Sequence, residues 1–235
     1  MSDDARVAVI AGVGPGNGTA LARRFAAEGY RIALLARQKS SFASLAEELP
    51  LARGYECDVS DAATVAATFG AIRAELGEIE ALLFNAGSGV FADVEAITPE
   101  QFEAAWRVNA LGALLCAQQV IPGMKAKGRG SIIFIGATAS RRGGPRTAAF
   151  APAKAAQRSL AESMAKSLGP TGIHVALIIV DGVVDLPRTR ERMPDKQDAF
   201  FVDPAGVAQI AMDLCRQSPR AWSFEVEARP AIEPW

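Results

Sequence analysis

The chain has 235 residues, of which 50% are hydrophobic and 22% are charged; 25 Lys and Arg against 26 Asp and Glu give a formal net charge of −1. This composition excludes a disordered or fibrous protein, and the balanced charge leaves no broad basic surface for nucleic acid or an anionic membrane. We therefore expect one domain over residues 1–235, with a small molecule as its partner and neither nucleic acid nor a membrane.

Targeting and cysteine patterns favour a cytoplasmic protein. Residues 1–4 are too polar for a signal peptide, and no apolar run reaches the roughly 18 residues of a membrane-spanning helix. The three cysteines, Cys57, Cys116 and Cys215, have no CxxC spacing, which favours reduced thiols over a disulfide framework. No group of Cys, His or carboxylate residues has metal-ligand spacing, so we expect no metal site.

Short apolar runs alternate with helical patterns along the chain. Apolar runs typical of buried parallel strands lie at residues 7–11, 32–36, 79–84, 132–135 and 173–180, and 222–230 resembles a last strand. Helical patterns lie near residues 18–28, 40–49, 61–76, 98–127 and 147–168. This succession predicts a Rossmann-type α/β fold, a doubly wound parallel sheet of about seven strands with helices on both faces.

Two helix ends carry clear signals. Thr98, Pro99 and Gln101 form the pattern of a capping box with proline in the first turn, which predicts a helix start. Gly29 follows the first helical pattern and suits a left-handed helix cap.

A glycine-rich turn follows the first expected strand at residues 12–19, directly before a helical pattern. Glycines there let the backbone approach a pyrophosphate, and the helix N-terminus offers free N–H groups. A P-loop needs a Lys before its Ser or Thr, but Gly18 precedes Thr19, and the G-x-G-x-x-G pattern fits in no register. The spacing that fits is G-x3-G-x-G, with Gly12, Gly16 and Gly18, which favours a dinucleotide site over a merely glycine-rich connection.

This spacing resembles the phosphate loop of the short-chain dehydrogenase/reductase family. The resemblance extends over roughly residues 6–230. Asp58-Val59 follows the third strand, where the family has an Asp that meets adenine. Asn85-Ala86-Gly87 matches the end of the family's Asn-Asn-Ala-Gly motif, with Phe84 in place of the first Asn.

Three further positions match the family later in the chain. Asn109 falls where the family has a catalytic Asn, and Lys154 falls at the Lys of its Tyr-x-x-x-Lys motif. Gly182 ends an Asp-Gly pair where the family has Pro-Gly. The resemblance implies cofactor contacts by Gly12, Gly16, Asn17, Gly18, Asp58, Val59, Asn85, Ala86, Gly87, Lys154, Gly182 and Val183.

Arg37 decides the expected form of the nicotinamide cofactor. It ends the second strand, where an acidic residue would bind the ribose 2′-OH of NAD and repel a 2′-phosphate. A guanidinium pairs well with a phosphate, so we expect NADP(H) to be favoured over NAD(H), with Arg37 on the 2′-phosphate. The alternative is an exposed strand-end Arg in a protein that uses NAD less selectively.

The catalytic positions depart from the family. Phe150 stands where the family has its Tyr proton donor, and Ala137 falls where it has a Ser that holds the carbonyl oxygen. Neither side chain can donate a hydrogen bond, and Tyr30 and Tyr55 are too far along the sheet to substitute. A general acid contributes roughly 10²–10⁴-fold to a rate and one oxyanion donor about 10²–10³. We therefore expect the loss of both groups to remove much of the chemical acceleration and to leave nucleotide binding intact.

Three ways around the missing hydroxyls are open, one of which is a substrate whose carbanion or conjugated system needs no strong acid. Thr138 or Ser140 is a candidate source of a hydroxyl, although both also suit an ordinary polar loop. A water held by Lys154 and Asn109 is the second source of a proton. His174, the only His, opens a strand and is expected to pack there, and Arg142 or Arg146 is a weaker candidate for meeting an acidic substrate.

Two hypotheses from different classes follow. The first is an NADP(H)-dependent oxidoreductase that acts on a carbonyl or alcohol by an atypical mechanism, with Asn109 and Lys154 as the surviving catalytic pair. The second is a catalytically impaired nucleotide-binding protein that acts as a sensor or oligomer partner. The segment 182–203 is expected to form the substrate loop, with residues 188–198 as either a solvated loop or a mobile flap. The resemblance also implies a homodimer or homotetramer.

Overall fold

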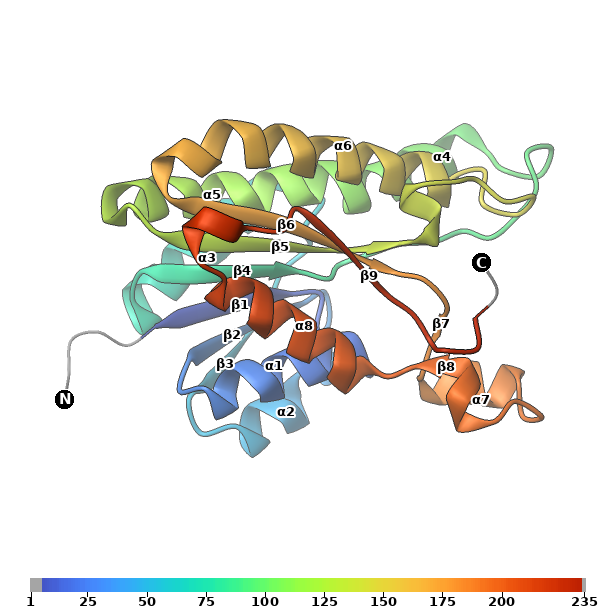
Figure 1. The fold of residues 1–235 in the computed structure, drawn as a ribbon, viewed down its shortest axis with the longest axis horizontal. Coiled ribbons are helices and arrows are strands. Elements are labelled where there is room, and N and C mark those ends of the chain that lie inside the picture. The colour runs from blue at the N-terminus through green and yellow to red at the C-terminus, as the bar shows by residue number, and fades with distance from the viewer. Residues whose placement is uncertain (1–5, 234–235) are drawn as a thin grey trace.

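A seven-stranded parallel sheet forms the centre of the molecule, in the order β3-β2-β1-β4-β5-β6-β9 (Figure 1). The computed structural model describes residues 6–233, so the polar N-terminus considered above lies outside the described residues. The strands are β1 (Val7–Ala11), β2 (Arg31–Ala36), β3 (Ala52–Glu56), β4 (Ile79–Phe84), β5 (Gly130–Ala137), β6 (Ile173–Val180) and β9 (Glu225–Ala228). The predicted Rossmann-type α/β fold is confirmed.

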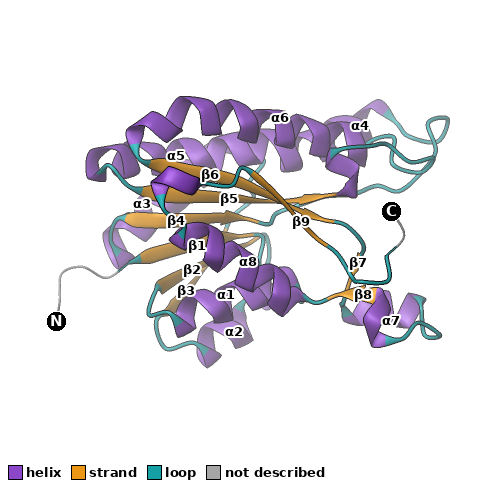
Figure 2. Cartoon of the chain, in the orientation of Figure 1, coloured by secondary structure: helices purple, strands orange, loops and turns teal. Residues whose placement is uncertain are grey.

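Helices cover both faces of this sheet (Figure 2). One face carries α1 (Asn17–Ala27), α2 (Ala43–Glu48) and α8 (Pro204–Arg216); the other carries α3 (Ala62–Leu76), α5 (Gly112–Lys127) and α6 (Phe150–Leu168). The inner strands β1, β4, β5 and β6 are largely apolar on both sides because each of them faces both helix layers, whereas the edge strands β3 and β9 are more exposed and more polar. In β1, for example, Val7 and Val9 pack with α3 and α5, while Ala8 and Ile10 pack with α1.

The strand order reverses between β1 and β4, and this reversal places the ligand site. The chain runs outward from β1 to β3 and then crosses to β4 on the other side of β1. The connections after β1 and β4 therefore diverge at the carboxyl ends of the strands, where doubly wound sheets bind their ligands.

The long helix expected over residues 98–127 is interrupted. It consists of α4 (Pro99–Trp106), a π-helical turn (Arg107–Leu111) and α5. Within the turn, the Asn109 side-chain amide donates a 2.8 Å hydrogen bond to the carbonyl oxygen of Ala105. A side chain that bonds the preceding turn competes with the regular helical ladder, which explains why a pattern read as one helix is divided.

Other element boundaries differ by a few residues from the expected ones. The helix expected at 40–49 starts with a 3-10 turn at 39–41, the one expected from 147 begins at Phe150, and the last strand is limited to Glu225–Ala228. Both predicted helix ends are confirmed: Thr98 and Gln101 make the capping box, and Gly29 has a φ of 80° after α1.

The segment 182–203 is more ordered than a simple loop. It forms a small ribbon of β7 (Val183–Val184) and β8 (Phe201–Val202), with α7 (Pro187–Arg192) between them. Arg190 of α7 bonds the carboxylates of Asp185 and Asp198, which closes the segment on itself. The reading of residues 188–198 as a plain solvated loop is therefore wrong in its first half. In the part of the chain described, no helix is both long and apolar enough to cross a membrane.

Candidate functional site

A cleft of about 600 Å³ opens at the carboxyl ends of β1 to β4. Its walls come from the glycine-rich turn after β1, the ends of β2 and β3, the turn after β4, and the start of α7. Among the predicted cofactor residues, those that line it are Gly12, Arg37, Asp58, Val59, Asn85, Ala86 and Gly87. The sheet thus brings together residues separated by up to 75 positions in the sequence.

Gly12 and Gly18 are required by the packing of the two turns against each other. A Cβ on Gly12 would lie 2.4 Å from the Ala86 nitrogen, and the residue has a φ of 95°. A Cβ on Gly18 would lie 2.7 Å from the carbonyl oxygen of Gly12. Asn85, in the turn after β4, also holds the two turns together, because its side-chain amide donates a 2.7 Å hydrogen bond to the Gly12 carbonyl oxygen. The spacing read from the sequence therefore corresponds to real close approaches.

Gly16 lies beneath α7 rather than on the cleft wall. Its φ is 92°, and a Cβ there would lie 2.1 Å from Cδ2 of Leu186, the residue that precedes α7. Next to it, the side-chain oxygen of Asn17 is buried and has no hydrogen-bond partner among residues 6–233. The first turn of α1 thus contains an unpaired polar atom next to the contact between Gly16 and Leu186.

Two charged side chains mark the outer part of the cleft. Arg37 is exposed at the end of β2, and its guanidinium has no hydrogen-bond or ion-pair partner in the described part of the chain. Asp58, after β3, accepts hydrogen bonds from the backbone nitrogen and the hydroxyl of Ser60 at 2.9 and 2.7 Å. Arg37 is therefore available to a ligand, while Asp58 is held in a fixed orientation.

Lys154 and Asn109 lie beside Gly87, at the edge of the cleft. Lys154 is 4% exposed, and its Nζ donates to the carbonyl oxygen of Ile135 at 2.9 Å and to Oε1 of Gln157 at 3.1 Å. Burial lowers the pKa of Lys154 from 10.5 to about 8. Asn109 is fully buried, and its amide nitrogen donates to the carbonyl oxygen of Ser88.

The side-chain oxygen of Asn109 is an unused hydrogen-bond acceptor. Asn109 Oδ1 is buried and has no hydrogen-bond partner within residues 6–233. It lies 3.4 Å, and Lys154 Nζ 3.9 Å, from the position that a Cβ on Gly87 would occupy. Gly87 lines the cleft, so an ammonium donor and an orphaned amide acceptor converge at its edge.

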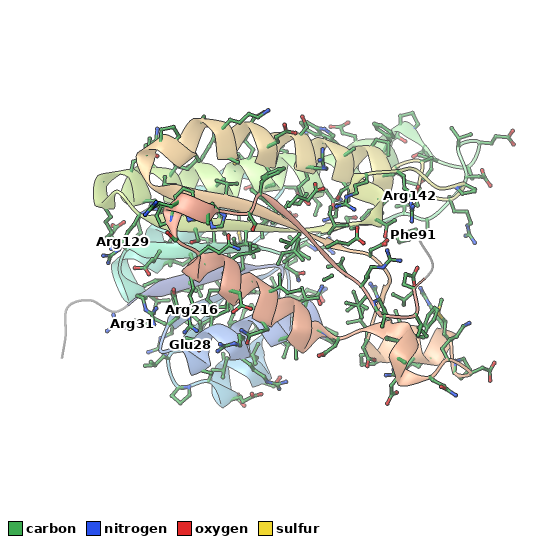
Figure 3. The ribbon with its side chains drawn as sticks, viewed as in Figure 1. Glu28, Arg31, Phe91, Arg129, Arg142 and Arg216 are labelled. Carbon is green, nitrogen blue, oxygen red and sulfur yellow. The ribbon has the colours of Figure 1, made fainter. Side chains whose placement is uncertain are left out.

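The positions of the missing hydroxyls are apolar, as expected from their residue types. The Phe150 ring centroid lies 6.0 Å from Lys154 Nζ and 5.3 Å from the ring of Phe91. Ala137 contributes only its backbone nitrogen, which donates to the Ser140 hydroxyl at 3.2 Å. Figure 3 shows Phe91 at the same end of the molecule as the carboxyl ends of the strands.

The two candidate replacement hydroxyls are engaged elsewhere. The Thr138 hydroxyl donates to Asp181, which is buried after β6, and Ser140 accepts from the Ala137 backbone. Thr138 and Asp181 line a separate cleft of about 130 Å³ together with Arg142. The geometry thus weakens the interpretation of Thr138 as a substitute for the family's Ser.

Several other predicted residues lie away from the cleft. Gly182 has a φ of 141° and packs against Pro230 and Val202, and Val183 belongs to the small ribbon of β7 and β8. The Tyr55 hydroxyl donates to Glu75 on the surface, as expected for a residue remote from the site.

His174 and Arg146 are also occupied away from the cleft. The His174 ring stacks on Trp222 at 4.8 Å, with its two nitrogens 3.0 and 2.8 Å from backbone carbonyl oxygens. Its packing role is as expected. Arg146 donates to the carbonyl oxygen of Phe91.

Pro187, Arg188 and Glu191 of α7 line the cleft. They lie within the segment 182–203 expected to form the substrate loop, but the sequence singles out none of them. Gln157 was also missed, although its place three residues after Lys154 puts both side chains on one face of a helix.

Comparisons with known proteins agree with this geometry. The sequence profile of the family described as short chain dehydrogenase matches residues 6–197. The chain is 31% identical to the 3-oxoacyl-acyl-carrier-protein reductase MabA of Mycobacterium tuberculosis over 185 residues, 79% of this chain and 72% of that protein. A short-chain dehydrogenase structure from Rhodopseudomonas palustris is 33% identical with a TM-score of 0.80, covering 97% of this chain and 100% of that one. A metagenomic short-chain oxidoreductase in complex with NADP is 26% identical with a TM-score of 0.84, covering 97% of both chains.

Proposed function

The chain belongs to the short-chain dehydrogenase family, and we propose that it binds NADP(H) in the cleft and exchanges a hydride with a small carbonyl or alcohol substrate without the family's usual tyrosine. The observation that carries this proposal is the convergence of Lys154 Nζ and the unpaired Asn109 Oδ1 beside Gly87, inside a cleft whose glycine turn is built for close backbone approach. A protein that only bound a nucleotide would use Lys154 but would have less need of Asn109.

The cleft fits a dinucleotide with a 2′-phosphate. The glycine turn leads into the N-terminus of α1, where free N–H groups and the helix dipole favour a pyrophosphate. Arg37 lines the outer cleft with a free guanidinium, which suits an additional phosphate. The related metagenomic oxidoreductase was solved in complex with NADP, which supports the same preference here.

The nicotinamide supplies the hydride, and the chain's residues must place the substrate and provide a proton. An ammonium has three hydrogens, and Lys154 uses two of them on Ile135 and Gln157. The third is available to a ribose hydroxyl or to a water at the cleft edge. Such a water would have Asn109 Oδ1 as its acceptor, since that atom is buried and otherwise unpaired. Such a water would pass a proton to the developing alkoxide oxygen and take one from the Lys154 ammonium, which would become a neutral amine and regain its proton from solvent.

A second candidate function is nucleotide binding without turnover. Phe150 packs on Phe91, and the hydroxyls of Thr138 and Ser140 are already engaged, so no side-chain hydroxyl stands where the family's donors stand. This arrangement favours a sensor or oligomer partner that keeps its nucleotide cleft.

One experiment separates the two functions. NADPH binding is measured by fluorescence titration, and turnover is measured with a panel of aldehydes, ketones and quinones. The proposal expects wild-type turnover that is lost in Lys154→Ala, with a rise of roughly 10² or more in the double variant Ala137→Ser with Phe150→Tyr. If wild-type protein binds NADPH but is inert until both hydroxyls are restored, the binding function is correct. Absence of NADPH binding would overturn both.

A further inference from the structure

Gln157 is a fully buried amide in α6 that the chemistry above has not used. Its side chain is 0% exposed, and a buried amide is costly unless both of its ends are hydrogen-bonded. Its Oε1 accepts from Lys154 Nζ at 3.1 Å, and its Nε2 donates to the main-chain carbonyl oxygen of Asn109 at 2.9 Å. One side chain therefore joins both members of the proposed catalytic pair.

The bridge adds a side-chain hydrogen bond between two elements that already pack against each other. Lys154 and Gln157 lie on α6, whereas Asn109 lies in the π-helical turn between α4 and α5. On its other side, the Lys154 ammonium is bonded to β5 through the Ile135 carbonyl. With two of its hydrogens fixed in different directions, the ammonium can direct only its third toward the edge of the cleft at Gly87.

We propose that Gln157 is a positioning residue: by joining the Lys154 ammonium to the Asn109 main chain, it fixes the direction of the free hydrogen and keeps the ammonium charged. This inference rests on the proposed function, because Lys154 is the group that Gln157 positions. An amide accepts a hydrogen bond without taking up a proton at ordinary pH. Because Gln157 cannot take a proton from Lys154, the ammonium can pass a proton only toward the cleft and not toward the π-helical turn.

The charge state of Lys154 depends on uncharged groups alone. Lys154 makes no ion pair with any residue from 6 to 233, and its hydrogen bonds come from β5 and from Gln157 of α6. From the π-helical turn and the chain after β4, the groups that approach are the Asn109 amide oxygen and Gly87. Because burial already lowers the pKa of Lys154 to about 8, loss of one of two acceptor oxygens would lower it further.

The first test is a titration of Lys154 in the protein without nucleotide. Lysines are labelled with ¹³C at Cε, and the Lys154 signal is identified by its absence in Lys154→Met. Gln157→Met should lower the midpoint by roughly one pH unit, and Gln157→Glu, which puts a carboxylate beside the ammonium, should raise it by a similar amount. Ala161→Gly, a buried change on α6 that touches neither Lys154 nor Asn109, should leave the midpoint in place.

The second test asks whether positioning affects binding. Gln157→Met should raise the NADPH dissociation constant about fivefold at pH 8, where about half of the wild-type ammonium but only about a tenth of the variant's is charged. The rise should be much smaller at pH 6, where the ammonium is charged in both proteins. Gln157→Glu has the same size as the native residue and serves if the Met variant does not fold. Lys154 midpoints that are unchanged in both Gln157 variants overturn the inference. Wild-type protein that fails to bind NADPH overturns the proposed function instead, and the nucleotide-free titration still decides the role of Gln157.

Discussion

Arg37 is the residue on which the form of the coenzyme depends. It combines three properties that a 2′-phosphate ligand needs: a place on the cleft wall, exposure to solvent, and a guanidinium with no partner in the described structure. Asp58, which lines the same cleft, is hydrogen-bonded to Ser60 and makes no ion pair with Arg37. The proposed preference for NADP(H) therefore depends on one free charge.

Replacing this charge should change selectivity more than affinity in general. In Arg37→Asp, the dissociation constant for NADPH should rise at least about tenfold more than that for NADH, because only NADPH has the phosphate that a carboxylate repels. Fluorescence titration with both coenzymes measures this. Arg53→Asp, the same charge reversal on exposed β3, is the control and should shift neither value selectively. Equal losses for both coenzymes in Arg37→Asp would contradict the assignment.

At the scale of elements, the site depends on how the turn after β1 packs against the turn after β4. The backbones of Gly12 and Ala86 are in direct contact, and Asn85 bonds across the same junction. The chain before α7 then covers the turn through Leu186 on Gly16. Each of these contacts joins segments remote in sequence, so the cleft is a property of packed elements rather than of any single loop.

Two alanine substitutions in one turn test this packing. Gly12→Ala places a methyl group 2.4 Å from a backbone nitrogen at a φ of 95°, and we expect a loss of about 2 kcal/mol or more together with loss of NADPH binding. Gly14→Ala, where a Cβ would meet no protein atom within 4 Å, should stay near wild type in stability. For a chain of this size the Gly12 loss corresponds to a fall of roughly 4–8 °C in Tm, readable by calorimetry. Equal Tm values for the Gly12→Ala and Gly14→Ala variants would show that the two turns do not require glycine at position 12.

At the scale of the whole molecule, the buried Lys154 should reduce folding stability at neutral pH. The unfolded chain titrates this lysine near 10.5 and the folded chain near 8, so between these values the unfolded state binds more protons. Stability attributable to Lys154 is therefore lowest below pH 8 and rises as the pH increases toward 10.5.

Comparison with Lys154→Met isolates this contribution. Between pH 7 and 10.5, the unfolding free energy of wild type should gain up to about 3 kcal/mol relative to Lys154→Met. Urea unfolding at several pH values measures the difference. Lys166→Met, which removes a mostly exposed lysine from the same helix, is the matched control and should show no such gain. A pH-independent difference for Lys154→Met would show that the ammonium is not buried at cost.

Two large apolar side chains are exposed on α4. Phe102 and Trp106 of α4 are 42% and 43% exposed, and they lie one turn apart on the helix that packs against α6. The homodimer or homotetramer expected from the family resemblance stays a prediction, as does the cytoplasmic location.

The sequence by itself determined the fold class and the glycine turn, and it predicts the catalytic departures. Apolar runs alternate with helical patterns over tens of residues. The spacing of the glycine turn, Lys154 and Phe150 are recognised from residue type and position in the sequence alone. Only the tertiary structure decided that Asn109 Oδ1 is unpaired, that Thr138 is bonded to Asp181, and that Gln157 bridges Lys154 to the π-helical turn. These facts depend on contacts between segments tens of residues apart, whose geometry is fixed by the packing of α6 against the sheet and the π-helical turn. A hydrogen bond is specified to within a few tenths of an ångström, whereas a sequence pattern specifies only which face of an element is buried.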